Sequence, residues 1–445
     1  MYIDFFLERF RNKPENEAMV WRDKIYTYRD FLEYVERDIV ELRKHISAPQ
    51  VVSLEADFSP QAASLLLALV ELGCVIVPLT AGLGEKKAEY KETAEVETAI
   101  ILQDDDSFVV QETGRTASHA LLTNLKQEHR PGLIIFTSGS TGKSKAAVHD
   151  FLPLLEKFRK ERPFARMIAF LLFDHISGIN TTLYAFANTC LITVKARRAE
   201  EVCQAVERYH ADILPVSPTF LNLILLSEAY KRYNMESLKL VTYGTEAMPE
   251  STLLRFYEAF PNVELRQMYG LSEIGIMRSK SRSSDSLWVK IGGEDFQTRV
   301  VDGLLEIRAK SAMLGYLNAP SPFTKDGWFK TGDEVLVDGE YFRILGRRSE
   351  MINVGGQKVF PAEVESVLQE MEGVEDAAVS GEASPMLGNI VKARVKLSTG
   401  EDAASFKKRM RAFCKGKLES FKIPQKIVLI DHMMTGERFK KMRRE

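Results

Sequence analysis

Cysteine is scarce in this sequence, and neither sign of charge is in clear excess. The 445 residues include four cysteines, Cys74, Cys190, Cys203 and Cys414, and none of them belongs to a C-x-x-C pair. This spacing argues against a zinc site or a disulfide framework and is typical of a reducing cytosol. The 60 basic and 62 acidic side chains nearly cancel. Net charge therefore gives no indication of binding to nucleic acid or to an anionic membrane.

Long uninterrupted apolar runs are also lacking. The most apolar stretch, SLLLALVELGCVIVPLT at 64–80, is broken by a glutamate, a glycine and a proline, and it is too short to span a bilayer. The amino-terminal run MYIDFFLERF contains Asp4 and Glu8, which argues against a signal peptide. We therefore expect a cytoplasmic protein without a transmembrane segment.

Strand-length apolar runs alternate with helix-like segments over much of the chain. Residues 23–46 predict a short strand and then an amphipathic helix that Thr27 caps, while Ser59 and Pro60 mark the start of the next helix. The runs RMIAFLLF, NTCLITV, ADILPVS and LKLVTYG have the length and composition of strands. This order predicts an α/β fold with layered, largely parallel sheets.

Residues 288–347 have a different pattern, with turns between short alternating strands, which predicts a small antiparallel or β-barrel-like unit. A mixed helix and strand pattern then resumes, after the polar segment GRRSE at 346–350. A chain of this length exceeds one compact core. We therefore predict a large amino-terminal domain at 1–346 and a small α+β carboxyl-terminal domain at 347–445.

The segment FTSGSTGKSK at 136–145 follows a predicted strand and ends like a Walker phosphate loop. A Walker loop requires glycine five positions before its Gly-Lys pair, and Thr137 stands there instead. The hydroxyls and free N–H groups of this turn can still hold a polyphosphate, with charge from Lys143 or Lys145. A flexible surface turn is the alternative that the loop alone leaves open.

Four further segments favour the nucleotide interpretation of this loop. The five segments together, in chain order, are TSGSTGKSK (137–145), YGLSE (269–273), MLGYLN (313–318), DGWFKTGD (326–333) and GRRSEMINVGGQKVFPAEVE (346–365). They resemble the motifs of the adenylate-forming superfamily, which contains acyl- and aryl-CoA synthetases, amino-acid adenylation domains and luciferases. The resemblance covers nearly the whole chain, although Ser144 and Ala146 replace the usual proline and glycine of the loop.

The resemblance implies a reaction at the α-phosphorus of ATP. A carboxylate attacks, pyrophosphate leaves, and a thiol then displaces AMP from the acyl-adenylate. The cofactors implied are ATP, Mg²⁺ and coenzyme A, or phosphopantetheine on an acyl carrier protein. The amino-terminal domain would bind ATP and the acid, and the carboxyl-terminal domain would be mobile.

The matched motifs also imply roles for individual side chains. Glu273 would coordinate Mg²⁺, Tyr269 would offer a face to adenine, and Ser272 would reach the α-phosphate. Asp333 and Arg347 would hold the ribose. The complete predicted ATP-binding set is Thr137, Ser138, Gly139, Ser140, Thr141, Gly142, Lys145, Gly244, Thr245, Glu246, Tyr269, Gly270, Ser272, Asp333 and Arg347.

The segment LLFDHISGI at 171–179 resembles the His-x-x-Gly motif of fatty- and aryl-acid ligases, with His175 beside the substrate carboxylate. Amino-acid-activating relatives place an aspartate next, to pair with the α-ammonium, and this chain has Ile176 there. An unpaired buried ammonium is costly, so we expect a carboxylic acid without an α-amino group. Asp174 should point elsewhere.

The hinge and the carboxyl-terminal tail depart from the family pattern. Ser349 occupies the hinge position, and the segment implied for the hinge and thiol tunnel comprises Ser349, Gly355, Gly356 and Lys358. The family's catalytic lysine follows a glycine near the end, where this chain has Glu437 after Gly436. We favour Arg438 as its replacement and Lys440 next. The predicted catalytic set is then His175, Lys145, Glu273 and Arg438.

Two alternatives to an acyl-CoA synthetase remain open from the sequence. One is a ligase that loads a carrier protein, which the basic terminal region could contact. The other is a nucleotide-binding protein without catalysis, which Glu437 alone suggests.

Overall fold

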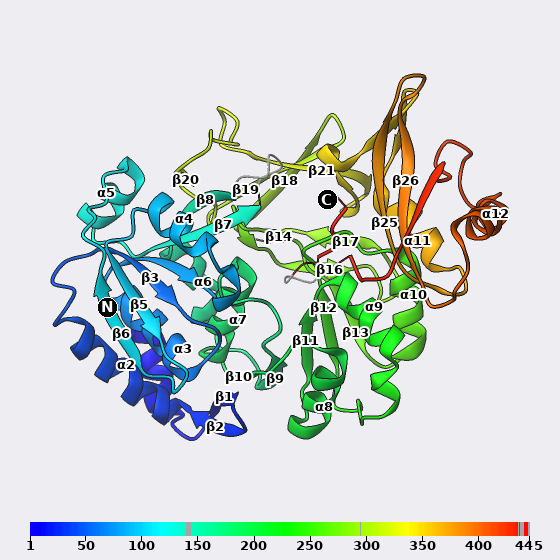
Figure 1. The fold of residues 1–445 in the computed structure, drawn as a ribbon. Coiled ribbons are helices and arrows are strands. Elements are labelled where there is room, and N and C mark those ends of the chain that lie inside the picture. Colours follow the sequence, from blue (N-terminus) through cyan, green and yellow to red (C-terminus); the bar gives the residue numbers. More distant parts are fainter. Residues whose placement is uncertain (139–143, 294, 435, 437–439, 444–445) are drawn as a thin grey trace.

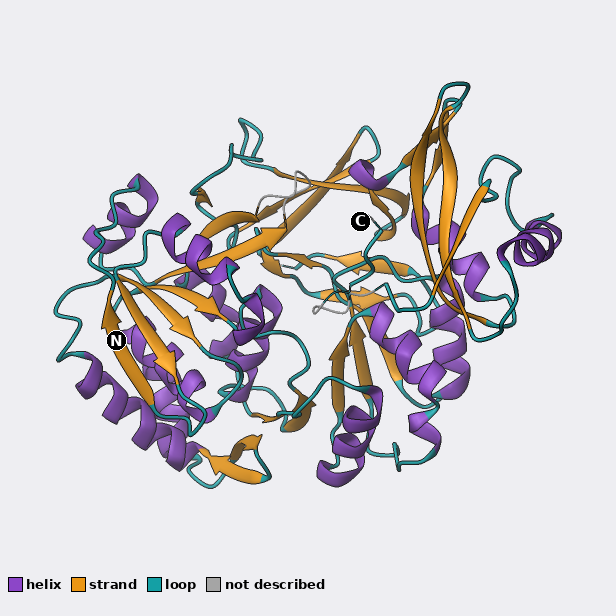
Figure 2. Ribbon diagram, viewed as in Figure 1, coloured by secondary structure: helices purple, strands orange, loops and turns teal. Residues whose placement is uncertain are grey.

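The computed structural model describes residues 1–138, 144–293, 295–434, 436 and 440–443. Figure 1 shows two stacks of helices and strands in the amino-terminal half and a separate sheet near the carboxyl terminus. Helices flank the amino-terminal sheets, as Figure 2 shows by colour. The fold is therefore mixed α/β with a large and a small part, as the sequence predicted.

The first sheet carries the candidate phosphate loop. Its order is β20 (Gly315–Tyr316), β8 (Ser144–Asp150), β7 (Gly132–Ser138), β4 (Val75–Leu79), β3 (Val51–Glu55), β5 (Thr98–Leu102) and β6 (Phe108–Glu112). The inner strands β7, β4, β3 and β5 are parallel. The helices of this part are α1 (Asp4–Asn12), α2 (Tyr28–Leu42), α3 (Pro60–Glu71), α4 (Lys86–Thr93) and α5 (Ala120–Gln127), with the short η1 (Ala81–Leu83).

Both predicted helix starts in this part are confirmed. Thr27 and Asp30 form a reciprocal capping box at the start of α2. The Ser59 hydroxyl accepts a 3.0 Å hydrogen bond from the Ala62 N–H at the start of α3. Such caps satisfy N–H groups that have no partner within the helix. Helix α3 is buried from Pro60 to Val70, which explains its apolar sequence without a membrane. No helix in the described ranges is both long and apolar enough to cross a bilayer.

The second sheet brings three groups of predicted site residues to one edge. Its order is β13 (Glu264–Gln267), β12 (Leu240–Tyr243), β11 (Ile213–Val216), β9 (Ala165–Ile168), β10 (Thr189–Ile192), β1 (Glu17–Trp21) and β2 (Lys24–Thr27). All neighbouring pairs except β1 with β2 are parallel. Its helices are α6 (Leu152–Arg159), α7 (Ile176–Ala185), α8 (Ala199–Tyr209), α9 (Pro218–Ser227) and α10 (Glu250–Ala259), with η2 (Ala229–Lys231). Ligands typically bind beyond the carboxyl ends of such strands, and the loops after β9, β12 and β13 carry site candidates.

The predicted antiparallel unit is a six-stranded sheet. Its order is β16 (Ser279–Ser281), β17 (Trp288–Ile291), β22 (Tyr341–Arg347), β21 (Phe329–Asp338), β19 (Leu304–Ala309) and β18 (Phe296–Val301). The two-stranded hairpin of β14 (Gly270–Leu271) and β15 (Gly275–Ile276) precedes it. Val289, Leu305, Ile307 and Phe342 belong to its buried core, which also contains Tyr269. The unit therefore supports one wall of the site.

The carboxyl-terminal part has its own sheet and core. Its elements are β23 (Ile352–Val354), β24 (Gln357–Val359), β25 (Val374–Ser384), β26 (Gly388–Leu397), β27 (Lys426–Ile430), α11 (Pro361–Gln369), α12 (Ala403–Cys414) and η3 (Arg348–Glu350). Helix α11 packs against α10 of the large part, where the Ser251 N–H donates to the Ser366 hydroxyl at 3.0 Å. A separate apolar cluster from α11, α12 and the sheet is what a distinct domain requires.

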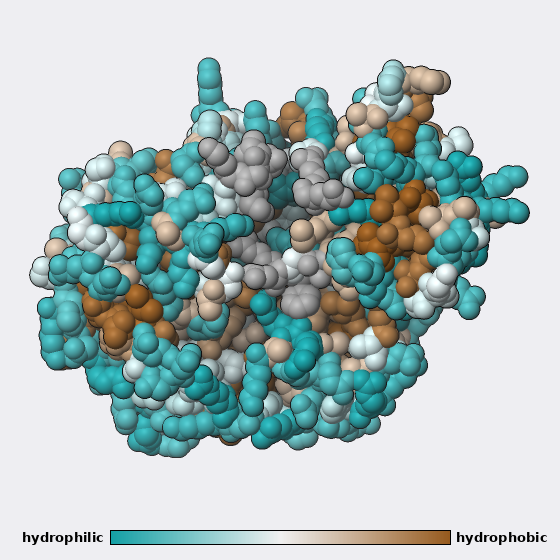
Figure 3. Space-filling model, viewed as in Figure 1, coloured by the Kyte–Doolittle hydropathy of each residue, from teal (hydrophilic) through white to brown (hydrophobic). Residues whose placement is uncertain are grey.

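Two surface and composition features agree with the sequence. All four cysteines are free and buried, and burial raises the pKa of Cys74, Cys190 and Cys203 to about 12. The visible face is mostly hydrophilic, with apolar side chains gathered over β5 and β6 and over the carboxyl-terminal sheet (Figure 3). The thiols are thus core residues rather than nucleophiles.

Candidate active site

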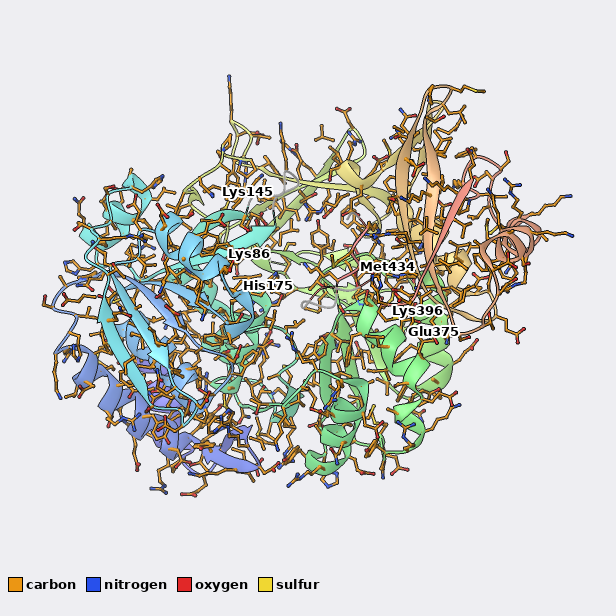
Figure 4. The ribbon with its side chains drawn as sticks, viewed as in Figure 1. Lys86, Lys145, His175, Glu375, Lys396 and Met434 are labelled. Atoms are coloured by element: carbon orange, nitrogen blue, oxygen red, sulfur yellow. The ribbon has the colours of Figure 1, made fainter. Side chains whose placement is uncertain are left out.

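A cavity of about 430 Å³ lies between the large part and the carboxyl-terminal tail. In Figure 4, Lys145 and His175 lie along the inner side of the amino-terminal half, and Met434 of the tail lies across from them. Most of the predicted site residues that the structure describes meet here. Those lining the cavity are Thr137, His175, Thr245, Glu246, Tyr269, Gly270, Ser272, Glu273, Asp333, Arg347 and Ser349.

The phosphate side of the cavity is built on β7 and β8. Thr137 pairs with Lys145 across these antiparallel strands, and the Lys145 Nζ lies 5.3 Å from the centre of the Tyr316 ring. The Tyr316 hydroxyl donates to Glu273 Oε1 at 2.7 Å. Residues 139–143, which include the predicted Gly139, Ser140, Thr141 and Gly142, lie outside the described residues, as does the Ser138 side chain. Lys145 and Glu273, the predicted phosphate-binding cation and the predicted Mg²⁺ ligand, therefore both contact Tyr316.

Asn318 explains why the MLGYLN segment matters. Its side chain accepts from the Ala146 N–H at 3.0 Å and donates to the Ser144 carbonyl at 2.9 Å. These two hydrogen bonds hold the start of β8, directly after the loop. The segment therefore contributes both the Tyr316 ring and a clamp on the strand that carries Lys145.

The buried Tyr269 and Asp333, together with the exposed Arg347, form the ribose side of the cavity. The Tyr269 hydroxyl donates to Asp333 Oδ2, and Arg347 Nε lies 2.8 Å from Asp333 Oδ1. Burial raises the pKa of Asp333, and the Arg347 charge opposes this shift. Burial likewise raises the pKa of Tyr269 well above its ordinary value, so its hydroxyl remains a donor. Each carboxylate oxygen has a second acceptor site, which leaves Asp333 able to accept from a sugar hydroxyl.

The acid side is built at the start of α7. His175 is the residue before the helix and lines the cavity, as does the buried Ile176. Asp174 accepts a hydrogen bond from the Thr80 hydroxyl at 3.2 Å and is 5% exposed. It is absent from the cavity lining, as predicted from its place one position before the histidine.

Gly178 allows the turn that presents His175. A Cβ atom at this position would lie 1.8 Å from the Leu172 carbonyl oxygen, which also accepts from the His175 N–H at 3.1 Å. Such an approach is available only to glycine, because real Cβ atoms do not come so close to backbone. This contact is the physical reason for the His-x-x-Gly spacing.

Replacing Gly178 with alanine should disrupt this turn and displace His175. We expect the free energy of unfolding to fall by about 2 kcal/mol or more, together with most acid activation, measured by thermal unfolding and by pyrophosphate release. Gly400→Ala is the matched control, because a Cβ there meets nothing within 4 Å. Equal stability and activity of the two variants would contradict this account.

The adenine side lies between β12 and β13. A Cβ on Gly244 would lie 2.7 Å from the Met268 carbonyl oxygen, so this close approach also requires glycine. Thr245 has a φ of +74°, a strained value for a non-glycine residue that is typical of functional sites. Glu246 has an additional structural task, since its carboxylate accepts from the Thr219 N–H and from the Lys441 N–H, each at 2.9 Å.

Two residues of this site were missed in the sequence. Gln267 lines the cavity and is 7% exposed, and its Oε1 has no hydrogen-bond partner in the described part of the chain. It can accept from a donor such as an adenine amino group. His149 is fully buried, and its Nε2–H donates to the Ser272 carbonyl at 2.7 Å. Their signals in the sequence were weak: Gln267 lies two positions before YGLSE, and His149 is the next-to-last residue of β8.

The hinge residues are only partly brought to the cavity. Ser349 lines it, but Gly355 and Gly356 form the turn between β23 and β24 with φ of +58° and +90°. Lys358 pairs with Glu334 Oε1 at 2.8 Å. Neither glycine nor Lys358 lines the cavity described here. Their predicted role in a thiol tunnel remains a prediction that requires another arrangement of the two parts.

A larger cavity of about 740 Å³ opens on the other side of the His175 loop. Basic side chains line part of it, namely Arg22, Lys195, Arg197 and Arg198. A narrow space lined by Leu172, His175, Arg197, Thr245 and Lys440 adjoins both cavities through shared residues. The acid site is thus approachable from two sides.

Two family models match the sequence. The AMP-binding enzyme model matches residues 6–302, and the model of the AMP-binding enzyme carboxyl-terminal domain matches 363–440. Together they cover both parts of the fold.

Individual relatives agree with the family models. A Mycobacterium tuberculosis ligase, 3-[(3aS,4S,7aS)-7a-methyl-1,5-dioxo-octahydro-1H-inden-4-yl]propanoyl:CoA ligase, is 30% identical over 67% of this chain and 62% of its own length. The 2-succinylbenzoate–CoA ligase of Listeria innocua is 26% identical over 96% of this chain and 95% of its own. The crystal structure of the anthranilate CoA ligase AuaEII with anthranoyl-AMP has a TM-score of 0.82 at 19% identity, covering 99% of this chain and 95% of that one. The resemblance found in the motifs is thereby confirmed, and the chain belongs to the AMP-binding enzyme family, among the adenylate-forming acid–thiol ligases.

Proposed function

We propose that this chain uses ATP to convert a carboxylic acid without an α-amino group into its acyl-adenylate, and then transfers the acyl group to coenzyme A. One observation carries the proposal. A single cavity combines His175 and Ile176 on its acid side with Glu273 and Asp333 on its nucleotide side. This arrangement can hold a carboxylate in line with the α-phosphorus of ATP.

The reacting groups are both anionic, so the site must bind them together and stabilise the charge that develops. Lys145 provides a cation beside the phosphate loop, and Asp333 with Arg347 orients the nucleotide through its ribose. Positioning and electrostatic stabilisation are the main sources of catalysis in phosphoryl chemistry of this kind. His175 would contact the acid carboxylate.

Glu273 is the residue proposed to hold Mg²⁺. Its carboxylate oxygen is a hard ligand of the kind that Mg²⁺ prefers, and the ion usually completes its coordination shell with phosphates and water. In the described ranges no cluster of three or more His, Cys, Asp or Glu side chains could hold a metal alone, which fits an ion bound together with ATP. When bound, Mg²⁺ neutralises phosphate charge.

We propose that the acyl acceptor approaches through the larger cavity. Its arginines and lysine suit the phosphates of coenzyme A, while the narrow space beside His175 leads towards the acyl group. We place the domain boundary between residues 346 and 347, at the end of β22 (Tyr341–Arg347), and the hinge at Ser349. Rotation there would bring the residues of the predicted thiol tunnel, Gly355, Gly356 and Lys358, to the site for the second step. The use of ATP and coenzyme A, with free buried thiols, suits the cytoplasm.

A phosphopantetheine arm on a carrier protein is the second candidate acceptor. Lys408, Arg411 and Lys415 of the α12 region are exposed, whereas Arg409 and Lys417 pair with Glu401 and Glu370. An exposed basic face can attract an acidic carrier. Thioester formation with free coenzyme A, compared with that on a carrier, decides between the two acceptors.

An acid panel tests the proposed substrate class. Aliphatic and aryl acids should be activated at least about thirtyfold better than their α-amino counterparts, because Ile176 leaves a buried ammonium without a partner. The measurement is pyrophosphate release with ATP and each acid, with and without coenzyme A. Ile176→Asp should weaken activation of apolar acids. Preference for amino acids would contradict the assignment, and absence of release with every acid would favour a nucleotide-binding protein without catalysis.

A further inference from the structure

We propose that Lys440 supplies the cation beside the reacting carboxylate and α-phosphate. The resemblance implies a lysine for this role at the position of Glu437, whose negative charge cannot perform it. This inference rests on the proposed function. Residues 437–439, including Arg438, lie outside the described residues, so the argument concerns where the following residues of the tail are held.

Lys440 lies where the two reactants would meet. It lines the nucleotide and acid cavity together with Thr137, His175 and Glu273. It also lines the narrow space that His175 and Thr245 share with the larger cavity. An ammonium group here stands between the proposed acid-binding and phosphate-binding walls.

The residue after Lys440 is anchored at both ends. The Lys441 N–H donates to Glu246 Oε2 of the large part at 2.9 Å. Its Nζ donates to Asp376 Oδ1 at 2.7 Å and to the Ala377 carbonyl at 2.9 Å. The Lys441 and Asp376 side chains are only 5% and 1% exposed. This buried pair holds the tail in place and commits the Lys441 charge to the carboxyl-terminal domain.

A second anchor follows two positions later. Arg443 Nε and Nη2 donate to the two oxygens of Glu365, each at 2.8 Å, and Nη1 donates to Glu350 at 2.9 Å. Two backbone hydrogen bonds also form within the tail. The Gly436 N–H donates to the Lys440 carbonyl at 3.2 Å, and the Met442 N–H donates to the Met434 carbonyl at 2.9 Å. The position of Lys440 is therefore fixed from both sides.

The anchors distinguish Lys440 from two other cations of the tail. Lys440, Lys441 and Arg443 all line the cavity, but Lys441 pairs with Asp376 and Arg443 pairs with Glu365 of the carboxyl-terminal domain. Lys440 also lines the narrow space beside His175, which Lys441 and Arg443 do not line. A one-residue shift would place Lys440 in the Asp376 pocket and remove its charge from the site.

The test separates the two half-reactions. Lys440→Met should reduce acid-dependent pyrophosphate–ATP exchange by roughly a hundred- to a thousandfold, as loss of one preorganised charge does. Conversion of a synthetic acyl-adenylate and coenzyme A into the thioester should change by less than about threefold, because the α-phosphate attack is already complete. Lys86→Met, the same substitution at an exposed position of α4, should leave both reactions unchanged.

Four results would contradict either this inference or the proposed function on which it rests. Equal losses in both half-reactions, together with a lowered unfolding temperature, would mean that Lys440 only supports the structure. Normal exchange by Lys440→Met, with the large loss in Arg438→Ala instead, would assign the charge to Arg438. If the unmodified protein shows no exchange, the proposed function itself is contradicted. If the unmodified protein and the Lys440→Met variant exchange at the same rate, only this inference is contradicted.

Discussion

Replacing Lys145 with alanine is expected to slow acid-dependent pyrophosphate release by roughly 30- to 1000-fold, or about 2–4 kcal/mol of transition-state stabilisation. Lys145 follows the loop on β8 and lies over the Tyr316 ring. Asn318 holds the strand on which it stands. Its charge is thus presented from a fixed backbone, and a charge-assisted contact with phosphate would be lost. The measurement is the initial rate of pyrophosphate release at saturating ATP.

Lys86→Ala is the control for this prediction. Lys86 begins α4, is exposed, and does not line the proposed site. Lys86→Ala therefore removes the same charge outside the site. The two variants should differ by more than tenfold. An unchanged rate in a folded Lys145→Ala variant would defeat the assignment. A Walker-type site would instead make Lys143 the sensitive residue and produce ADP rather than AMP.

Replacing Glu273 with glutamine should raise the Mg²⁺ concentration needed for half-maximal activity and reduce the rate by roughly a hundredfold at low Mg²⁺. The glutamine carbonyl can still accept from the Tyr316 hydroxyl, which now donates to Glu273 at 2.7 Å. The loss would therefore report the missing negative charge and not a broken hydrogen bond. Initial rates over a Mg²⁺ series provide the measurement.

Tyr316→Phe completes the comparison. It removes the hydrogen bond and keeps the carboxylate, so we expect a loss of about 1 kcal/mol, or roughly fivefold, with little change in the Mg²⁺ requirement. The same metal dependence in Glu273→Gln and in the unmodified protein would show that Glu273 does not hold the ion. A larger loss in Tyr316→Phe than in Glu273→Gln would assign the main role to the tyrosine.

Local features of the fold were readable from the sequence. The capping residues Thr27 and Ser59 act at the starts of their own helices, and the four quoted strand-length runs between 166 and 244 correspond to the parallel strands β9–β12. Such signals depend on side chains a few positions apart, which a linear pattern reports directly. The sequence likewise placed Ile176 beside His175, because the motif is continuous along the chain.

Contacts between distant segments were beyond the reach of these patterns. Tyr269 and Asp333 belong to separate motifs, and only packing of the antiparallel unit brings the hydroxyl to the carboxylate. Gln267 lies outside every quoted motif, and only the packed structure shows that it lines the cavity and that its buried Oε1 has no hydrogen-bond partner among the described residues. Burial and orientation are properties of the packed chain, which a linear pattern does not report.

The carboxyl-terminal tail marks the division most clearly. The sequence by itself determined that Glu437 stands where a lysine is expected and that two lysines follow at 440 and 441. It could not distinguish them, since both carry the same charge on adjacent residues. The tertiary structure distinguished them, because Glu246, 195 positions away, binds the Lys441 backbone and Asp376 binds its ammonium group. Those contacts pair the Lys441 charge within the carboxyl-terminal domain, whereas Lys440 also lines the narrow space beside His175.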